Sequence, residues 1–277
     1  KSFLLLKRKK IGQILSTGGY MSLPIILAAR LLKLNIYLLE PNQVLGRSNR
    51  YFLRSCKKIF CYSKRIKNFP DEFKDKIIII NPLVKKNIYS LKKPVKINDK
   101  FTLLIVGGSQ GASIFDGSLK KSIVNISKKY PIKIIHQTEE KNIHLLTDFY
   151  SKNHIDNKIF NFDKDFVQYI LEADLCVTRA GASTLAELSV MKTPFIAVPL
   201  PTSKDNHQME NANFYKESDS CWIIEQNNFE EKIEEFLIDI LNNKSDYLNK
   251  KENLKKLNYQ NTWINVNQKI LNIINEN

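Results

Sequence analysis

The stretch of sequence that decides the fold is Thr178-Arg179-Ala180-Gly181-Ala182-Ser183-Thr184-Leu185-Ala186-Glu187. The mostly apolar residues 173–177 lead into it, and a helical apolar pattern of Leu185, Leu188 and Met191 leads out. We therefore expect the chain to leave a strand, make a tight turn and enter a helix. In this geometry, backbone N–H groups and the positive end of the helix point toward an anion. The Arg179 guanidinium can meet a phosphate at two points, and the Glu187 carboxylate can accept from hydroxyl groups.

A helix cap is the alternative interpretation of the same segment. Thr184 and Glu187 have the Thr-x-x-Glu spacing of a capping box, in which two side chains satisfy free N–H groups at a helix start. Such a cap suits any protein of alternating strands and helices. The segment alone therefore leaves both interpretations open.

The composition indicates a chain with one large or two ordinary domains, because its 277 residues are 43% hydrophobic. No apolar run approaches the ~20 residues of a membrane-spanning helix. The N-terminus lacks the pattern of a secretory signal. Residues 2–10 are expected to end a basic helix, so the sequence is expected to start inside a structural unit.

Four cysteines without a Cys-x-x-Cys pair indicate thiols of a reducing cytosol and argue against a zinc site: Cys56, Cys61, Cys176 and Cys221.

The charge is concentrated in the first third of the chain. Residues 1–94 hold 21 Lys and Arg against 4 Asp and Glu, whereas residues 95–277 hold 22 against 24. The net charge of +15 thus comes from the first third. Such a block favours phospholipid head groups, nucleic acid or a polyphosphate substrate as partner. A solvated surface of a Lys- and Asn-rich protein is the alternative, although the remaining two thirds lack the same bias.

Short apolar runs alternate with helical patterns, which is typical of α/β proteins with parallel sheets covered on both faces. We interpret the polar segment 91–100 as a linker between a first domain, residues 1–94, and a second, residues 95–277. Ligands of doubly wound sheets bind beyond the C-terminal ends of the strands, so two such halves are expected to enclose a cleft. The expected strands are 11–15, 36–39, 59–62, 77–80, 101–106, 132–136, 158–160, 175–178, 195–198 and 222–224. The expected helices are 22–33, 45–54, 112–129, 140–152, 166–172, 184–191, 208–217 and much of the chain after residue 230.

Three glycine-bearing turns follow predicted strands and precede predicted helices: residues 17–20, 107–111 and 178–184. Each lets a backbone approach a ligand closely. None matches the P-loop or the dinucleotide fingerprint, which argues against ATPase and NAD-dependent chemistry. A fourth polar cluster, residues 199–208, suits a sugar or a diphosphate. A solvated loop with a helix cap at Asp205 or Asn206 is its alternative.

Together these segments resemble the MurG family of glycosyltransferases, which add N-acetylglucosamine to the lipid-linked muramyl-pentapeptide of peptidoglycan synthesis. The likeness runs from near residue 11 to past residue 225. The resemblance implies a GT-B fold, with two Rossmann-like doubly wound domains around a cleft. It also implies an incomplete first domain and a last helix, about residues 261–275, that packs back on it. The resembling motifs are residues 17–24, Glu40-Pro41-Asn42 with Gly46 and Asn49, Asn81-Pro82, and residues 107–112, 179–187, 205–208 and 211–212.

The resemblance implies a site for a UDP-sugar in the second domain, with no metal and no cofactor, because UDP-N-acetylglucosamine is a substrate. Contacts to the diphosphate and sugar region are implied for Ser109 and Gln110. Ala182, Ser183 and Thr184 would face the phosphates, with Arg179 nearby, and Gly181 belongs to the same substrate-binding set. Sugar and ribose contacts are implied for Glu187, Gln208 and Asn211. Asn42 would reach across from the first domain, and Lys85 stands where the family has an Arg. The acceptor-side loop would be Thr17, Gly18, Gly19 and Tyr20.

The catalytic base stays unassigned. The family begins with a further strand and a glycine-rich loop that carries a proposed catalytic histidine, and this sequence does not contain them. The histidines present, His136, His144, His154 and His207, are poor candidates. A polypeptide that starts at Lys1 is therefore expected to bind the donor without turnover.

The activity implied by the resemblance is an inverting hexosyl transfer at the cytoplasmic face of the bacterial inner membrane. Its partners would be UDP-N-acetylglucosamine, undecaprenyl-pyrophosphoryl-muramyl-pentapeptide and an anionic membrane surface. A related UDP-N-acetylglucosamine epimerase or glycolipid synthase is the alternative, although residues 205–208 and the basic first domain favour the transferase. Nucleic-acid binding is disfavoured because no module motif is present and the aromatics at 51–69 have the spacing of core residues.

Overall fold

The computed structural model describes residues 1–93, 100–107, 112–164 and 166–276. The chain forms two compact units. Unit 1 comprises Lys1–Leu83, Asp205–Glu210 and Gln260–Asn277, and unit 2 comprises Val84–Lys204 and Asn211–Tyr259. Most of the predicted linker falls on residues 94–99, outside the described ranges.

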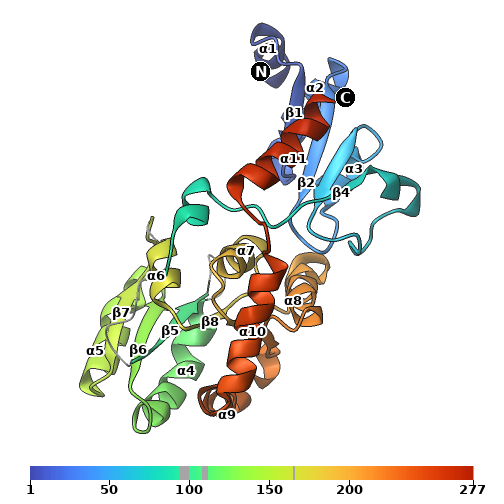
Figure 1. Cartoon of the computed structure of the whole chain (residues 1–277). Helices are drawn as coiled ribbons and strands as arrows, with labels where there is room; N and C mark the ends of the chain where they lie inside the picture. The colour runs from blue at the N-terminus through green and yellow to red at the C-terminus, as the bar shows by residue number, and fades with distance from the viewer. Residues whose placement is uncertain (94–99, 108–111, 165, 277) are drawn as a thin grey trace. The chain divides into compact units, whose positions relative to one another are not determined.

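Unit 1 contains a four-stranded parallel sheet in the order β1-β2-β3-β4 (Figure 1). The four strands predicted in this part of the chain are confirmed. The core lies where the apolar residues of the central strands meet α2 and α3, for example Ile36 and Leu38 with Ile26 and Phe52. The strands are β1 (Gln13–Ser16), β2 (Asn35–Glu40), β3 (Lys58–Cys61) and β4 (Ile77–Ile79). The helical elements are α1 (Ser2–Arg8), η1 (Tyr20–Ser22), α2 (Leu23–Leu31), α3 (Arg47–Phe52), η2 (Asp71–Lys76) and α11 (Trp263–Asn275).

The last helix, α11, belongs to unit 1 although it follows unit 2 in sequence. Its apolar face buries Val266, Ile270 and Ile274. The hydroxyl of Tyr37, a fully buried residue of β2, donates to the Ile274 carbonyl at 3.3 Å. The end of the chain is thus fixed to the sheet of the unit in which the chain begins.

Unit 2 contains a six-stranded parallel sheet in the order β10-β9-β8-β5-β6-β7. The strand order reverses between β5 and β8, which makes their C-terminal ends the position where doubly wound sheets bind ligands. The strands are β5 (Phe101–Val106), β6 (Ile132–Gln137), β7 (Asp156–Phe160), β8 (Leu175–Thr178), β9 (Phe195–Ala197) and β10 (Trp222–Ile223). The doubly wound α/β topology predicted for this half is confirmed.

Alternate residues of the central strand β5 face opposite layers of helices. Leu103 and Ile105 pack with α4, α5 and α9, whereas Leu104 and Val106 pack with α6, α7, α8 and α10. The α-helices are α4 (Ala112–Ser127), α5 (Ile143–Lys152), α6 (Phe166–Glu172), α7 (Ala182–Val190), α8 (His207–Glu217), α9 (Phe229–Asn242) and α10 (Lys244–Leu257). The short helices are η3 (Lys86–Ser90), η5 (Glu140–Asn142), η6 (Lys204–Asn206) and η7 (Gln226–Asn228). The helix predicted over 140–152 is therefore divided into η5 and α5.

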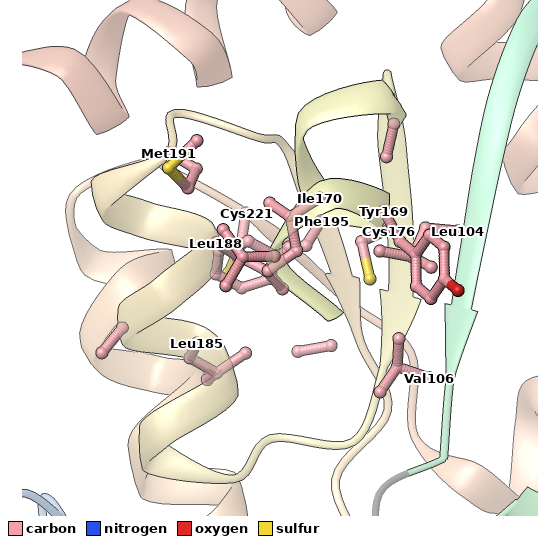
Figure 2. Close-up of a cluster of buried hydrophobic side chains, with 14 of the residues drawn as sticks. Leu104, Val106, Tyr169, Ile170, Cys176, Leu185, Leu188, Met191, Phe195 and Cys221 are labelled. Atoms are coloured by element: carbon pink, nitrogen blue, oxygen red, sulfur yellow. The ribbon is translucent and has the colours of Figure 1, made fainter. Parts of the chain in front are cut away.

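The inner face of α7 holds the helix against the sheet. Leu185 and Leu188 are fully buried, and Figure 2 shows them directed toward Ile170, Phe195 and the other labelled core side chains. Burial of such side chains stabilises the fold by about 1.5–3 kcal/mol each. This packing fixes the position of the first turn of α7, which carries the predicted anion site.

No described helix combines the length and the apolar character that a bilayer crossing requires.

Candidate functional site

The turn between β8 and α7 lies at the strand-order reversal of unit 2. The Arg179 backbone N–H donates to the carbonyl of Val106, the last residue of β5, at 3.2 Å. Helix α7 begins at Ala182, with Gly181 as an extended N-cap residue that makes no side-chain capping bond. The first i→i−4 bond at this end joins the Leu185 N–H to the Gly181 carbonyl at 3.0 Å. The N–H groups of the three residues before Leu185 therefore lack i−4 partners in the helix.

The capping-box interpretation of this segment is wrong. The helix was predicted to begin at Thr184, but it begins two residues earlier. Thr184 is consequently the third helical residue and Glu187 the sixth, so neither occupies a position in which its side chain caps the helix start. The reason is that Gly181 has φ −70° and ψ 132° and already serves as the N-cap.

Glu187 is a half-buried carboxylate one turn into α7. Burial raises its pKa, and the nearby charge of Lys85 opposes that rise. Lys85 is exposed and precedes η3, a short helix that contacts α7. Two residues that the sequence predicted for one site, Lys85 and Glu187, are thus electrostatic neighbours within unit 2. Among the residues that the structure describes, the Glu187 carboxylate accepts no hydrogen bond.

Arg179 is held at the turn by hydrogen bonds to the surrounding protein. Its side chain is buried, with 7% of the residue exposed. Its Nη1 donates to the Val198 carbonyl at 3.1 Å, and its Nη2 donates to Gln226 Oε1 at 2.6 Å. These two bonds use one N–H of each terminal nitrogen, and the phosphate contact predicted for Arg179 stays a prediction. The presence of Arg179 beside the α7 turn agrees with the predicted location.

Asn211 supports the same turn from α8. The residue is 3% exposed, and its Nδ2 donates to the Ala180 carbonyl at 3.1 Å. Gln208 lies in the first turn of α8, in the segment Asp205–Glu210 that belongs to unit 1. The sugar contacts predicted for both residues stay predictions. Ser109 and Gln110 lie outside the described residues.

The predicted acceptor-side loop of unit 1 follows β1. Gly18 and Gly19 have φ +79° and +81°, a region that residues with side chains rarely adopt. A Cβ built on Gly18 would lie 2.9 Å from Oδ1 of Asn49. This loop therefore needs glycine at residue 18 for both its backbone conformation and its close packing.

Glu40 organises the segment that contains Asn42. The Glu40 residue is 2% exposed, and its carboxylate accepts from both the backbone N–H and Nδ2 of Asn42, at 3.2 and 3.0 Å. It also accepts from the Gly46 N–H at 2.8 Å and from Asn49 Nδ2 at 3.0 Å. Asn49 Nδ2 donates to the Leu39 carbonyl as well, so Oδ1 of Asn49 is the atom that faces Gly18. Glu40 thus fixes the Asn42 segment and Asn49, and Asn49 in turn lies against Gly18.

Sequence reasoning missed the roles of Glu40 and Gln226. Glu40 carried a signal, because an acidic residue that ends an apolar strand and precedes Asn42 and Gly46 is unusual in a core. Gln226 carried none, since it lies 47 residues from its partner Arg179.

The histidine with the clearest structural role, His136, is fully buried against Asp116 and Tyr150, and burial lowers its pKa. In the described ranges, no group of three or more His, Cys, Asp or Glu side chains is arranged to hold a metal ion.

Comparisons with known proteins match both halves of the chain. Residues 102–262 match the glycosyltransferase family 28 C-terminal domain, and residues 1–61 match the glycosyltransferase family 28 N-terminal domain. The chain is 50% identical over 278 residues to the UDP-N-acetylglucosamine–N-acetylmuramyl-(pentapeptide) pyrophosphoryl-undecaprenol N-acetylglucosamine transferase of Pelagibacter ubique, covering 100% of this chain and 78% of that protein. The enzyme of the same name from Rickettsia canadensis is 36% identical over 249 residues, covering 88% and 70%.

Solved structures share the fold. MurG of Acinetobacter baumannii superposes with a TM-score of 0.76 at 24% identity, covering 100% of this chain and 76% of that one. UDP-GlcNAc 2-epimerase of Neisseria meningitidis, bound to UDP-GlcNAc, gives a TM-score of 0.68 at 14% identity, covering 99% and 79%. At such identities the likeness shows the fold alone, and it confirms the predicted GT-B class. The sequence identity to the named transferases decides the family: the chain belongs to the MurG family of UDP-N-acetylglucosamine-dependent glycosyltransferases.

Proposed function

We propose that the chain transfers N-acetylglucosamine from UDP-N-acetylglucosamine to the undecaprenyl-pyrophosphoryl-linked muramyl-pentapeptide of peptidoglycan synthesis. The names of the 50% and 36% identical relatives support this assignment. The observation that carries it in the structure is the start of α7. Gly181 caps it without a side-chain bond, and the Glu187 carboxylate lies one turn further beside Lys85.

In the proposed reaction, the 4-hydroxyl of the muramyl sugar attacks the anomeric carbon of the donor and inverts it. The new carbon–oxygen bond forms as the bond to the diphosphate breaks, the hydroxyl proton passes to a base that is not assigned to any residue of this sequence, and UDP leaves. Negative charge develops on the leaving diphosphate. The N–H groups at the start of α7 would stabilise that charge in the way that fixed dipoles stabilise transition states.

The roles proposed for the binding residues are those that the family resemblance implies. The backbone of Ala182, Ser183 and Thr184 would bind the diphosphate, and Glu187 would accept from the ribose hydroxyls. Ser109, Gln110, Gln208 and Asn211 are proposed to bind the diphosphate and the sugar, and Asn42 to contribute from unit 1. The loop of Thr17, Gly18, Gly19 and Tyr20 is proposed for the acceptor side.

We also propose that unit 1 associates peripherally with an anionic membrane surface at the cytoplasmic face of the inner membrane. Exposed apolar side chains gather on η1 and α2, where Met21 is 93%, Leu27 42% and Leu31 75% exposed. Arg30 and Lys33 are exposed on the same segment. Apolar contact and attraction to anionic lipids reinforce each other at such surfaces.

Transfer of radiolabel from UDP-N-acetylglucosamine to the lipid acceptor tests the activity, and calorimetric titration with UDP tests the donor site. Transfer that requires the acceptor supports the proposal. Conversion of the donor to an epimer without an acceptor would instead assign the chain to the epimerases. Flotation with vesicles that contain phosphatidylglycerol, compared with phosphatidylcholine alone, tests the membrane surface. Equal flotation with both would contradict an anionic partner.

A further inference from the structure

Arg179 carries a buried positive charge that has no carboxylate partner in the described part of unit 2. The residue is 7% exposed and forms no ion pair with any described Asp or Glu. Burial is the cause that lowers its pKa from the ordinary value. Buried charges in proteins are normally paired, because an unpaired one is costly to remove from water. This charge is therefore a feature that folding alone does not explain.

Every group that holds the guanidinium is neutral. The acceptors are the Val198 carbonyl, at 3.1 Å, and the side-chain amide of Gln226, at 2.6 Å. The guanidinium carbon lies 5.4 Å from the centroid of the Phe115 ring, and Nε has no hydrogen-bond partner among the described residues. Neutral partners fix the orientation of the group without cancelling its charge.

These partners come from three elements that converge on the β8–α7 turn. Val198 follows β9, Gln226 begins η7 and Phe115 belongs to α4. The Arg179 backbone itself bonds the end of β5. The charge is thus held at the strand-order reversal, three residues before the first helical residue of α7.

We propose that Gln226 is a positioning residue, whose neutral amide holds the Arg179 guanidinium beside the start of α7 and leaves its charge available to the diphosphate of a nucleotide sugar. This inference rests on the proposed function of the same site. Gln226 acts through Arg179 and does not touch the ligand. The guanidinium acts through its positive charge, and its orientation is fixed by one hydrogen bond from each terminal nitrogen.

The size of the effect follows from Coulomb attraction. A unit charge about 10 Å from an anion, at an effective dielectric constant of ~20, changes the dissociation constant roughly ten-fold. The effect must grow with the charge of the ligand, so it separates UDP from UMP and from uridine. A purely structural role for Arg179 would change the affinities for all three ligands alike.

The decisive variant is Gln226→Glu, which gives the buried guanidinium a carboxylate partner at the same position. We expect the melting temperature to rise and the UDP affinity to fall about ten-fold, with a smaller loss for UMP and none for uridine. Asn227→Asp is the matched control, since it adds the same charge to an exposed residue of η7. Unchanged UDP affinity in folded Gln226→Glu would overturn the inference.

Arg179→Met is the second variant, and it keeps the inference testable if Gln226→Glu does not fold. It removes the charge while retaining an unbranched side chain. We expect a loss of UDP affinity that exceeds the loss for uridine by about ten-fold, whereas equal losses would overturn the inference. Failure of the unmodified chain to bind UDP would refute the proposed donor site and this inference with it. If the unmodified chain binds UDP and neither Gln226→Glu nor Arg179→Met changes that affinity, this inference alone is refuted.

Discussion

The turn after β1 and the turn after β8 both place glycine between a parallel strand and a helix, but glycine serves a different purpose in each. Gly18 has φ +79°, and a Cβ there would lie 2.9 Å from Asn49 Oδ1. Gly181 has φ −70°, and a Cβ there would find no atom of another described residue within 4 Å. Asn49 fills the space beside Gly18, whereas no described residue beyond its chain neighbours fills the space beside Gly181.

The same contrast holds for the charged residues beside the two turns. Glu40 is buried in unit 1 and accepts four hydrogen bonds from Asn42, Gly46 and Asn49. Glu187 in unit 2 accepts none from the residues described, and Lys85 is the charge that acts on it. A satisfied carboxylate holds a loop in place, while an unsatisfied one is available to a ligand. The comparison predicts that substitutions in unit 1 change stability and that substitutions in unit 2 change binding.

Glu40→Gln should have the largest effect. The new amide NH2 would replace an oxygen that accepts two hydrogen bonds and would face their donors. We expect the free energy of unfolding of unit 1 to fall by about 2–4 kcal/mol, because buried donors lose their acceptor. Urea denaturation followed by the fluorescence of Trp263, with Trp222 replaced by Phe, reports on unit 1. The exposed Glu72→Gln serves as control, and equal midpoints for the two variants would contradict the role of Glu40.

Gly18→Ala should come next. Alanine must adopt a positive φ and displace Asn49, so we expect a loss of about 2 kcal/mol in the free energy of unfolding of unit 1. The same Trp263 fluorescence measures it. Gly12→Ala is the matched control, because no positive φ and no close neighbour constrain Gly12. Equal free energies of unfolding for Gly18→Ala and Gly12→Ala would show that the Gly18 turn does not need its glycine.

Glu187→Gln should reduce the affinity for UDP about ten-fold, the size expected for hydrogen bonds to a charged group. The melting temperature at neutral pH should not fall, since the carboxylate makes no hydrogen bond to the described chain and burial disfavours its charged form. Calorimetric titration and thermal unfolding measure the two quantities, with the exposed Glu225→Gln as control. Unchanged UDP affinity would remove Glu187 from the ribose site.

Gly181→Ala should weaken UDP binding several-fold and lower the free energy of unfolding by at most about 1 kcal/mol, because alanine is a poorer N-cap residue than glycine. The added methyl group fits the φ of −70° and meets no other described residue within 4 Å, so it would occupy space beside the N–H groups of α7. Titration with UDP and urea denaturation test both parts. A destabilised variant with normal UDP affinity would reverse the contrast between the two turns.

The pH dependence of stability should show the smallest effect. Burial raises the pKa of Glu187, so the folded chain holds its proton more tightly than the unfolded chain. This contribution is complete below the unfolded value of about 4.3 and is lost as pH rises through the folded pKa. The stability of the unmodified chain relative to Glu187→Gln should therefore fall over the window that begins at the unfolded value of about 4.3 and ends above the folded pKa. A constant difference in urea midpoints over that window would show that burial does not perturb this carboxylate.

The sequence predicted which strands and helices form better than it predicted the residues at which they begin and end. Every predicted strand has a counterpart, because short apolar runs between glycine-bearing turns are a local property of the chain. The start of α7 was misplaced because Thr184 and Glu187 have the spacing of a capping box. Gly181 adopts the extended N-cap conformation instead, and the spacing of two side chains does not reveal that backbone choice.

The sequence by itself determined the parallel α/β class, the basic first third of the chain, the turns that bear glycine, and the motifs that indicate the MurG family. Only the tertiary structure decided that Arg179 is buried against Gln226, that Glu40 bonds both Asn42 and Asn49, and that Lys85 acts on Glu187. The physical reason is that a parallel sheet gathers its strand ends at one edge. Residues far apart in sequence meet there, and the periodicity that predicts each strand contains no information about which partners its ends will find.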